Sequence, residues 1–120
     1  MSLSTPLSMQ RHGGVLRLRP EKIADYKRLH EAVWPDVLRI MHEAHIRNYS
    51  IFLRRLPDGV HYLFSYFEYV GSDFAADMAR LAADPVTERW WALCKPCQDP
   101  LPDRSPDEWW ASMEEVFHHD

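Results

Sequence analysis

The stretch IRNYSIFLRRLPDGVHYLFSYFEYV, residues 46–70, decides the fold. Polar and apolar side chains alternate in both of its halves, and this alternation is typical of β-strands. Between the halves, the PDG of residues 57–59 is a turn signal, because proline presets one backbone dihedral and glycine accepts a positive φ. We therefore predict a β-hairpin with strands at 46–56 and 60–70, in which Tyr49 faces inward.

The segments outside the hairpin complete an α+β pattern. Alternation predicts two further strands, at 13–20 and 113–119. Apolar residues at helical spacing predict helices at 21–34, 37–44, 71–84 and 84–93.

The ends of these helices carry recognisable signals. The proline after Trp34 disfavours a helical conformation at that tryptophan, so the first helical segment should break there. Ser72 and Asp84 have the short polar side chains that cap helix N-termini. Ser105 and Glu108 form a capping-box pattern.

The order strand, helix, strand, strand, helix, strand predicts a ferredoxin-like split βαβ sandwich, an antiparallel sheet with helices on one face. Residues 12–119 should form this single domain, preceded by a disordered tail at 1–11. The uncovered face would expose large aromatics from the 60–70 strand, which is too much apolar surface to leave in water. We therefore expect a homodimer that packs sheet on sheet, a dimeric α+β barrel.

Composition narrows the classes of partner. The chain has 120 residues and a formal net charge of −4, which argues against a nucleic-acid surface. It contains neither the long apolar run of a membrane helix nor a signal-peptide pattern at its start. A cytoplasmic location is expected, with no membrane or nucleic-acid partner.

Cys94 and Cys97 form a Cys-x-x-Cys pattern, for which the ordinary interpretation is favoured. The pair follows a predicted helix, whereas a redox motif places its first cysteine where a helix begins, because the helix N-terminus lowers the thiol pKa. Structural zinc requires four ligands, and there is no second cysteine pair. We predict two reduced cysteines, with no metal and no cofactor.

Tyr26 and His30 are the most suggestive polar pair. They stand four residues apart and share one face of the first predicted helix. Imidazole groups exchange protons near neutral pH, so His30 could serve as an acid or base, although a structural histidine is the alternative. His42 and His45 are three apart, not the four of a zinc-protease helix, and a solvated face is favoured for them.

Trp90 and Trp91 are adjacent and therefore point about 100° apart on a helix. One indole can lie in the core while the other lines a cavity, where its flat face suits the C–H groups of a sugar. Taken alone, core packing is the favoured interpretation of both. Tyr49, if buried, needs a hydrogen-bond partner for its hydroxyl.

The ordered set of these residues resembles the L-rhamnose mutarotase family. YKRLHEAVWPDV resembles its Tyr-x-x-x-His followed by Trp-Pro, NYSIFL its Asn-Tyr strand, RWW its Arg-Trp-Trp helix and EEVFH its closing strand. The resemblance covers roughly residues 12–118. The segment LCKPCQDPLPDRSPDEWW, which adds Trp109 and Trp110, departs from the family pattern and leaves the identity of the sugar open.

The resemblance implies an isomerase that interconverts the α and β anomers of a 6-deoxy-L-hexose, L-rhamnose first and L-fucose as the alternative. It implies that His30 donates the proton and that Tyr26, Tyr49, Trp90 and Trp91 contact the substrate. Two functions of other classes share the architecture: a dimeric α+β-barrel monooxygenase, and a non-catalytic dimer that binds a small ligand.

Overall fold

The computed structural model describes residues 9–120. Its elements follow the chain as β1 Gln10–Leu18, the 3₁₀ turn η1 Pro20–Lys22, α1 Ile23–Glu31, α2 Pro35–Glu43, β2 Ile46–Arg55, β3 His61–Tyr69, α3 Phe74–Ala83, α4 Pro85–Cys94, the 3₁₀ turn η2 Lys95–Cys97, β4 Gln98–Asp99 and β5 Ala111–Met113.

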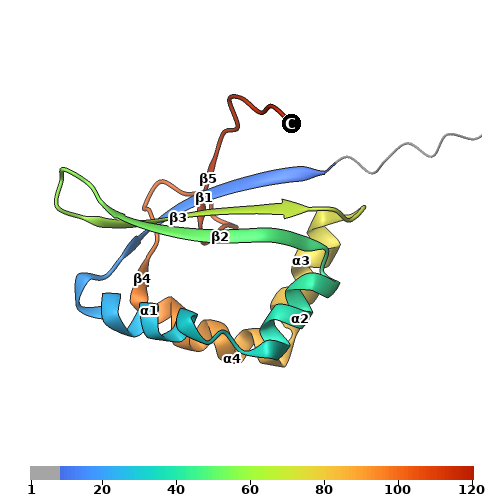
Figure 1. Cartoon of the computed structure of the whole chain (residues 1–120), viewed down its shortest axis with the longest axis horizontal. Helices are drawn as coiled ribbons and strands as arrows, with labels where there is room; N and C mark the ends of the chain where they lie inside the picture. Colours follow the sequence, from blue (N-terminus) through green and yellow to red (C-terminus); the bar gives the residue numbers. More distant parts are fainter. Residues whose placement is uncertain (1–8) are drawn as a thin grey trace, which may run out of the picture.

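The antiparallel sheet has the order β2-β3-β1-β4, and β5 pairs with β1 beyond the end of β4. The four helices lie together on one side of it, and the C-terminal segment leaves on the other side (Figure 1). This arrangement confirms the α+β prediction: an antiparallel ferredoxin-like sheet with helices on one face. We refer to the uncovered side as the open face.

The hairpin forms as its sequence predicts. Gly59 has a φ of +83°, and the Leu56 amide donates to the Val60 carbonyl at 3.0 Å across the turn. The register of β2 against β3 shifts between Arg47 and Ser50, where Asn48 has a φ of +52°. Asparagine tolerates this left-handed conformation better than most residues, and the shift lies directly beside Tyr49.

The predicted break at Trp34 is also confirmed. α1 ends at Glu31, Trp34 has an extended ψ of 133°, and α2 begins at Pro35. A proline is tolerated at the first helical position because the amide hydrogen it lacks would have no partner there. The break separates two short helices, α1 and α2.

The core lies between the sheet and the helices. Leu16, Leu18 and Leu63 are at most 1% exposed and project from the central strands toward Tyr26 and Trp90 of the helical layer. Each such leucine stabilises the fold through roughly 1.5–3 kcal/mol of apolar burial.

Four details differ from the sequence predictions. The α3 N-cap is Asp73 rather than Ser72: its carboxylate accepts from the Ala76 amide at 3.1 Å. β1 already includes Gln10 and Arg11, residues that the predicted tail of 1–11 contained, while residues 1–8 lie outside the described part. The remaining two differences concern the C-terminal quarter of the chain.

The closing strand is shorter and earlier than predicted, because β5 ends at Met113. Beyond it the backbone ladder with β1 stops, and the side chains of Arg11 and Glu115 form an ion pair at 3.0 Å instead. The Ser105–Glu108 pattern caps no helix. The Glu108 carboxylate accepts from the Ser105 amide at 3.0 Å, but the segment is a turn, stabilised further by hydrogen bonds from Ser112 to the same carboxylate.

A buried carboxylate ties α3 to the sheet. Asp77 accepts hydrogen bonds from the Tyr69 hydroxyl and Arg80, and from Nδ1 of His45 at 3.0 Å. Its side chain is 8% exposed. The Tyr69 hydroxyl, supported by His45 and Arg80, holds the pKa of Asp77 below its usual value.

Because the folded pKa of Asp77 is depressed, its stabilising effect is present above the unfolded-state pKa, near ~4, and is lost as pH falls through the lower folded value. We expect Asp77→Asn to lower the melting temperature at pH 7 by about 5 °C or more. The deficit relative to wild type should shrink below about pH 4. Thermal unfolding followed by circular dichroism at several pH values measures both effects, and a deficit that does not change with pH would contradict this role of the carboxylate.

Candidate active site

Tyr26 and His30 meet on α1 as their spacing predicts. Their ring centroids are 4.2 Å apart, and Nδ1 of His30 lies 2.9 Å from the backbone carbonyl oxygen of Tyr26. A carbonyl oxygen only accepts hydrogen bonds, so Nδ1 of His30 carries a proton. The free atom for proton exchange is therefore Nε2.

Trp90 joins this pair from α4. Its ring lies edge-on to His30 at 5.4 Å and edge-on to Trp34 at 5.2 Å. Trp90 is 6% exposed, so it belongs to the core and also borders the histidine. The structure thus brings Tyr26, His30 and Trp90 into one cluster, to which the helix break at Trp34 contributes a second indole.

Trp91 lies outside this cluster and has different contacts. The ammonium group of Lys95 lies 4.9 Å from the Trp91 ring and 4.8 Å from the ring of Trp109, between the two indoles. A cation over an aromatic face is attracted by the quadrupole of the ring. The two adjacent tryptophans therefore point to different sides of α4, Trp90 toward α1 and Trp91 toward the loop that carries Trp109.

Tyr49 lies on the helix side of β2 and stacks on Phe67 with a centroid distance of 5.5 Å. Surrounding protein raises the pKa of Tyr49 to about 12. The side chain nevertheless keeps 38% of its surface accessible. Water therefore reaches part of Tyr49, and its phenol stays protonated at neutral pH.

Tyr26 is held in a similar protonation state. It is 5% exposed, and burial raises the pKa of its hydroxyl, an effect that a hydrogen bond from Gln98 partly opposes. Nε2 of Gln98 lies 3.2 Å from the Tyr26 oxygen, and Nε1 of Trp109 donates to Oε1 of Gln98 at 2.7 Å. At neutral pH both tyrosines are thus neutral phenols rather than phenolates.

The sequence does not indicate that Gln98 and Trp109 lie beside these residues. Gln98 meets Tyr26 across 72 residues of chain, a contact that no local spacing encodes. The sequence gives only an indirect signal: both residues lie in the segment that departs from the family pattern.

Two surface hollows lie beside α4, and one of them adjoins the cluster. One of about 400 Å³ lies between α1 and α4, with Leu29, Trp34 and Trp90 in its wall. A second, of about 630 Å³, is bordered by Trp91 and Lys95. Neither wall includes Tyr26, His30 or Tyr49.

The cysteines have the properties of ordinary core thiols. Cys94 and Cys97 are free and buried, and burial raises the pKa of Cys94 to about 12. Burial also raises the pKa of Cys97, whose sulfur lies 3.7 Å from the Leu93 carbonyl oxygen. Neither thiol is ionised at neutral pH, so neither has the reactivity of a thiolate.

Within residues 9–120, no group of three or more His, Cys, Asp or Glu side chains is arranged to hold a metal ion. In the same part of the chain, no helix has the length and apolar character needed to cross a bilayer.

Fold and site together define a ferredoxin-like α+β protein with a cluster of histidine, phenol and indole side chains where α1 packs on α4. The family model of L-rhamnose mutarotase matches residues 11–119. This match covers nearly the whole chain, and the chain belongs to the L-rhamnose mutarotase family. It is accordingly an isomerase of the mutarotase kind.

Individual relatives agree with this assignment. The chain is 34% identical over 103 residues to the L-rhamnose mutarotase of Burkholderia ambifaria, covering 86% of this chain and 91% of the relative. It is 29% identical to the L-rhamnose mutarotase of Oceanobacillus iheyensis, covering 93% of this chain and all of the relative.

Solved structures agree on the fold. The L-rhamnose mutarotase FA22100 of Formosa agariphila superposes with a TM-score of 0.67 at 24% identity, covering 92% of this chain and 99% of that protein. The tetracenomycin F2 cyclase of Streptomyces glaucescens, a type-II polyketide cyclase, superposes with a TM-score of 0.63 at 14% identity, covering 92% and 97%. The same architecture therefore serves different chemistries.

Proposed function

We propose that this protein interconverts the α and β pyranose anomers of L-rhamnose. The observation that carries the proposal is the contact of His30 with Tyr26 and Trp90 in a chain of the mutarotase family. Mutarotation needs only positioned acid and base groups, each of which contributes about 10²–10⁴-fold. The cluster offers such groups.

In the proposed reaction, the C1–O5 bond of the pyranose breaks while the O1–H electron pair becomes the second bond of the C1 aldehyde. One proton leaves O1, and another is delivered to O5 by Nε2 of the protonated His30. Rotation about C1–C2 then presents the other aldehyde face, and the reverse steps close the ring as the opposite anomer. Protons and electrons balance, and no oxidant or reductant takes part.

The tyrosines have a complementary part in this proposal. Because the pKa of each phenol is raised, Tyr26 and Tyr49 bind sugar oxygens as neutral hydrogen-bond donors rather than removing the O1 proton. A carboxylate or a water molecule is left as the base. Trp90 and Trp91 are proposed as substrate contacts, with Trp90 the indole next to the acid–base group.

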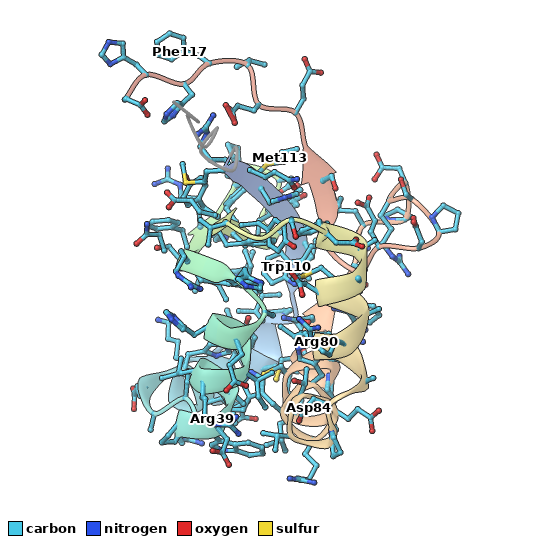
Figure 2. All side chains as sticks on the ribbon, turned by 90° about the vertical axis from the view of Figure 1, so that its right-hand side faces the viewer. Arg39, Arg80, Asp84, Trp110, Met113 and Phe117 are labelled. Atoms are coloured by element: carbon cyan, nitrogen blue, oxygen red, sulfur yellow. The ribbon has the colours of Figure 1, made fainter. Side chains whose placement is uncertain are left out.

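Homodimerisation is part of the same proposal. Phe52 on the open face is 63% exposed, directly opposite Phe64 in the sheet register. Val116 and Phe117 are 86% and 79% exposed on the C-terminal segment, which extends away from the helices (Figures 1 and 2). A second copy packed on the open face would remove this apolar surface from water. The cytoplasmic location and the lack of a cofactor or metal remain predictions.

Exchange NMR on the anomeric protons tests the substrate. Saturating one anomer of L-rhamnose in the presence of wild-type protein should attenuate the signal of the other well beyond the buffer control, and L-fucose should respond more weakly. A stronger response with L-fucose would reassign the sugar and keep the reaction. If neither sugar exchanges faster than in buffer, the proposed reaction is wrong for both.

A further inference from the structure

A chain of hydrogen bonds reaches the proposed site from the C-terminal loop. Trp109 donates through Nε1 to Oε1 of Gln98 at 2.7 Å, and Nε2 of Gln98 donates to the Tyr26 hydroxyl oxygen at 3.2 Å. Gln98 is 6% exposed and sits on β4, opposite Leu18 of β1. This chain of hydrogen bonds, Trp109 to Gln98 to Tyr26, is called the relay below. It joins the loop before β5 to α1 through a buried amide.

The direction of this relay follows from chemistry. An indole N–H only donates, so the group facing Trp109 must be the amide oxygen of Gln98. The amide NH₂ then faces Tyr26, and it can only donate to the phenol oxygen. The hydrogen bonds of residues 9–120 provide no acceptor for the Tyr26 proton itself. The Tyr26 hydroxyl can therefore donate this proton to a bound molecule.

The start of the relay is fixed by two cations. Lys95 lies 4.8 Å and the guanidinium carbon of Arg104 lies 5.7 Å from the centroid of the Trp109 ring. Nε of Arg104 also donates to the Glu108 carbonyl at 2.9 Å, which ties the guanidinium to the loop. Cations over the ring hold the indole in place, and linked hydrogen bonds strengthen one another.

We propose that Gln98 and Trp109 are positioning residues. The Gln98 amide occupies the acceptor side of the Tyr26 hydroxyl, so that this hydroxyl donates its proton to a lone pair on a sugar oxygen. This inference rests on the proposed mutarotase function. Without the relay, a phenol can rotate and present either its proton or its lone pairs, and part of its orientation toward the sugar is lost. Substrate oxygens that must themselves donate would be rejected at this position.

The decisive variant is Gln98→Glu, which is nearly isosteric. An ionised carboxylate accepts from both Trp109 and Tyr26, so the Tyr26 proton turns away from the sugar. We expect anomer exchange by the variant to fall about 3–10-fold relative to wild type at neutral pH, the effect of losing one oriented hydrogen bond. Burial raises the pKa of the introduced carboxyl group. Below that pKa the group is protonated, so it can again accept from Trp109 and donate to Tyr26.

The ratio of variant to wild-type activity should therefore rise as pH falls. A ratio that does not change with pH would overturn the inference. Gln98→Glu should cost nothing further in a Tyr26→Phe background, because Gln98 acts only through the Tyr26 hydroxyl. Tyr62→Phe, at a hydroxyl that donates to Asp58 near the hairpin turn, is the matched control and should leave activity unchanged.

A readout without sugar separates this inference from the proposed reaction. The tyrosine Raman doublet reports this geometry through the intensity of its higher-frequency band divided by that of its lower-frequency band. This ratio is high when a phenol oxygen accepts a hydrogen bond and low when the phenol donates one. The difference spectrum between wild type and Tyr26→Phe isolates Tyr26 among the five tyrosines. We expect a high ratio in wild type and a low one in Gln98→Glu at neutral pH.

If the buried carboxylate prevents folding, Trp109→Phe serves instead: it keeps an aromatic ring but removes the indole N–H, which frees the Gln98 amide to turn over. The Tyr26 ratio should then fall as well. An unchanged ratio in the folded variant would overturn the relay, whether or not the protein acts on a sugar. Conversely, the expected Raman result without any anomer exchange by wild type would contradict the proposed reaction alone.

Discussion

Replacing His30 with asparagine is expected to lower kcat for anomer exchange by about 10²–10⁴-fold, the range for loss of a general acid–base group. The asparagine amide can still donate to the Tyr26 carbonyl oxygen that Nδ1 of His30 contacts at 2.9 Å, so the helix should be preserved. It cannot carry a proton that exchanges near neutral pH. KM should change much less than kcat, because the sugar contacts assigned to the tyrosines and tryptophans remain.

His42→Asn is the matched control for this experiment. His42 is an exposed residue of α2, so its loss should leave the rate unchanged. Saturation-transfer NMR at equal protein concentrations compares both variants with wild type, and circular dichroism verifies that each is folded. Acceleration that survives His30→Asn at the wild-type level would remove His30 from the proposed mechanism.

The second large effect is expected at the open face. Phe52→Asp should convert the proposed homodimer into a monomer and raise the dissociation constant by about 10³-fold or more. Phe52 is 63% exposed in the single chain and lies opposite Phe64, so the substitution costs little within the protomer. In a symmetric interface each dimer carries the new charge twice, desolvated against an apolar surface.

Leu38→Asp is the matched control, because Leu38 is 51% exposed on α2, on the other side of the molecule. Light scattering at micromolar concentration should give a dimer mass for wild type and Leu38→Asp and a monomer mass for Phe52→Asp. A monomer mass for the wild-type protein would contradict the expected sheet-on-sheet packing.

Local regularities explain why much of the architecture was predictable. Alternation across residues 46–70 specified the hairpin, and a proline after Trp34 specified the helix break. The i,i+4 spacing of Tyr26 and His30 placed them side by side because helix geometry alone determines that contact.

Longer-range features were not accessible in this way. The alternation at 113–119 described the faces of a strand without showing whether a neighbouring strand would pair with it, and the ladder ends at Met113. The register shift beside Tyr49 depends on how β2 and β3 fit together, which the sequence of neither strand shows by itself. The contact of Gln98 with Tyr26 and the approach of Trp90 to His30 arise only when the helices pack on the sheet.

The central claim, catalysis of anomer exchange, is tested most directly by polarimetry on freshly dissolved crystalline L-rhamnose. A crystal delivers essentially one anomer, and optical rotation then relaxes to the equilibrium value at the rate of mutarotation. Catalytic amounts of the wild-type protein are predicted to shorten this relaxation in proportion to protein concentration, without changing the final rotation. Relaxation at the buffer rate, at every protein concentration and with a demonstrably folded protein, would contradict the account.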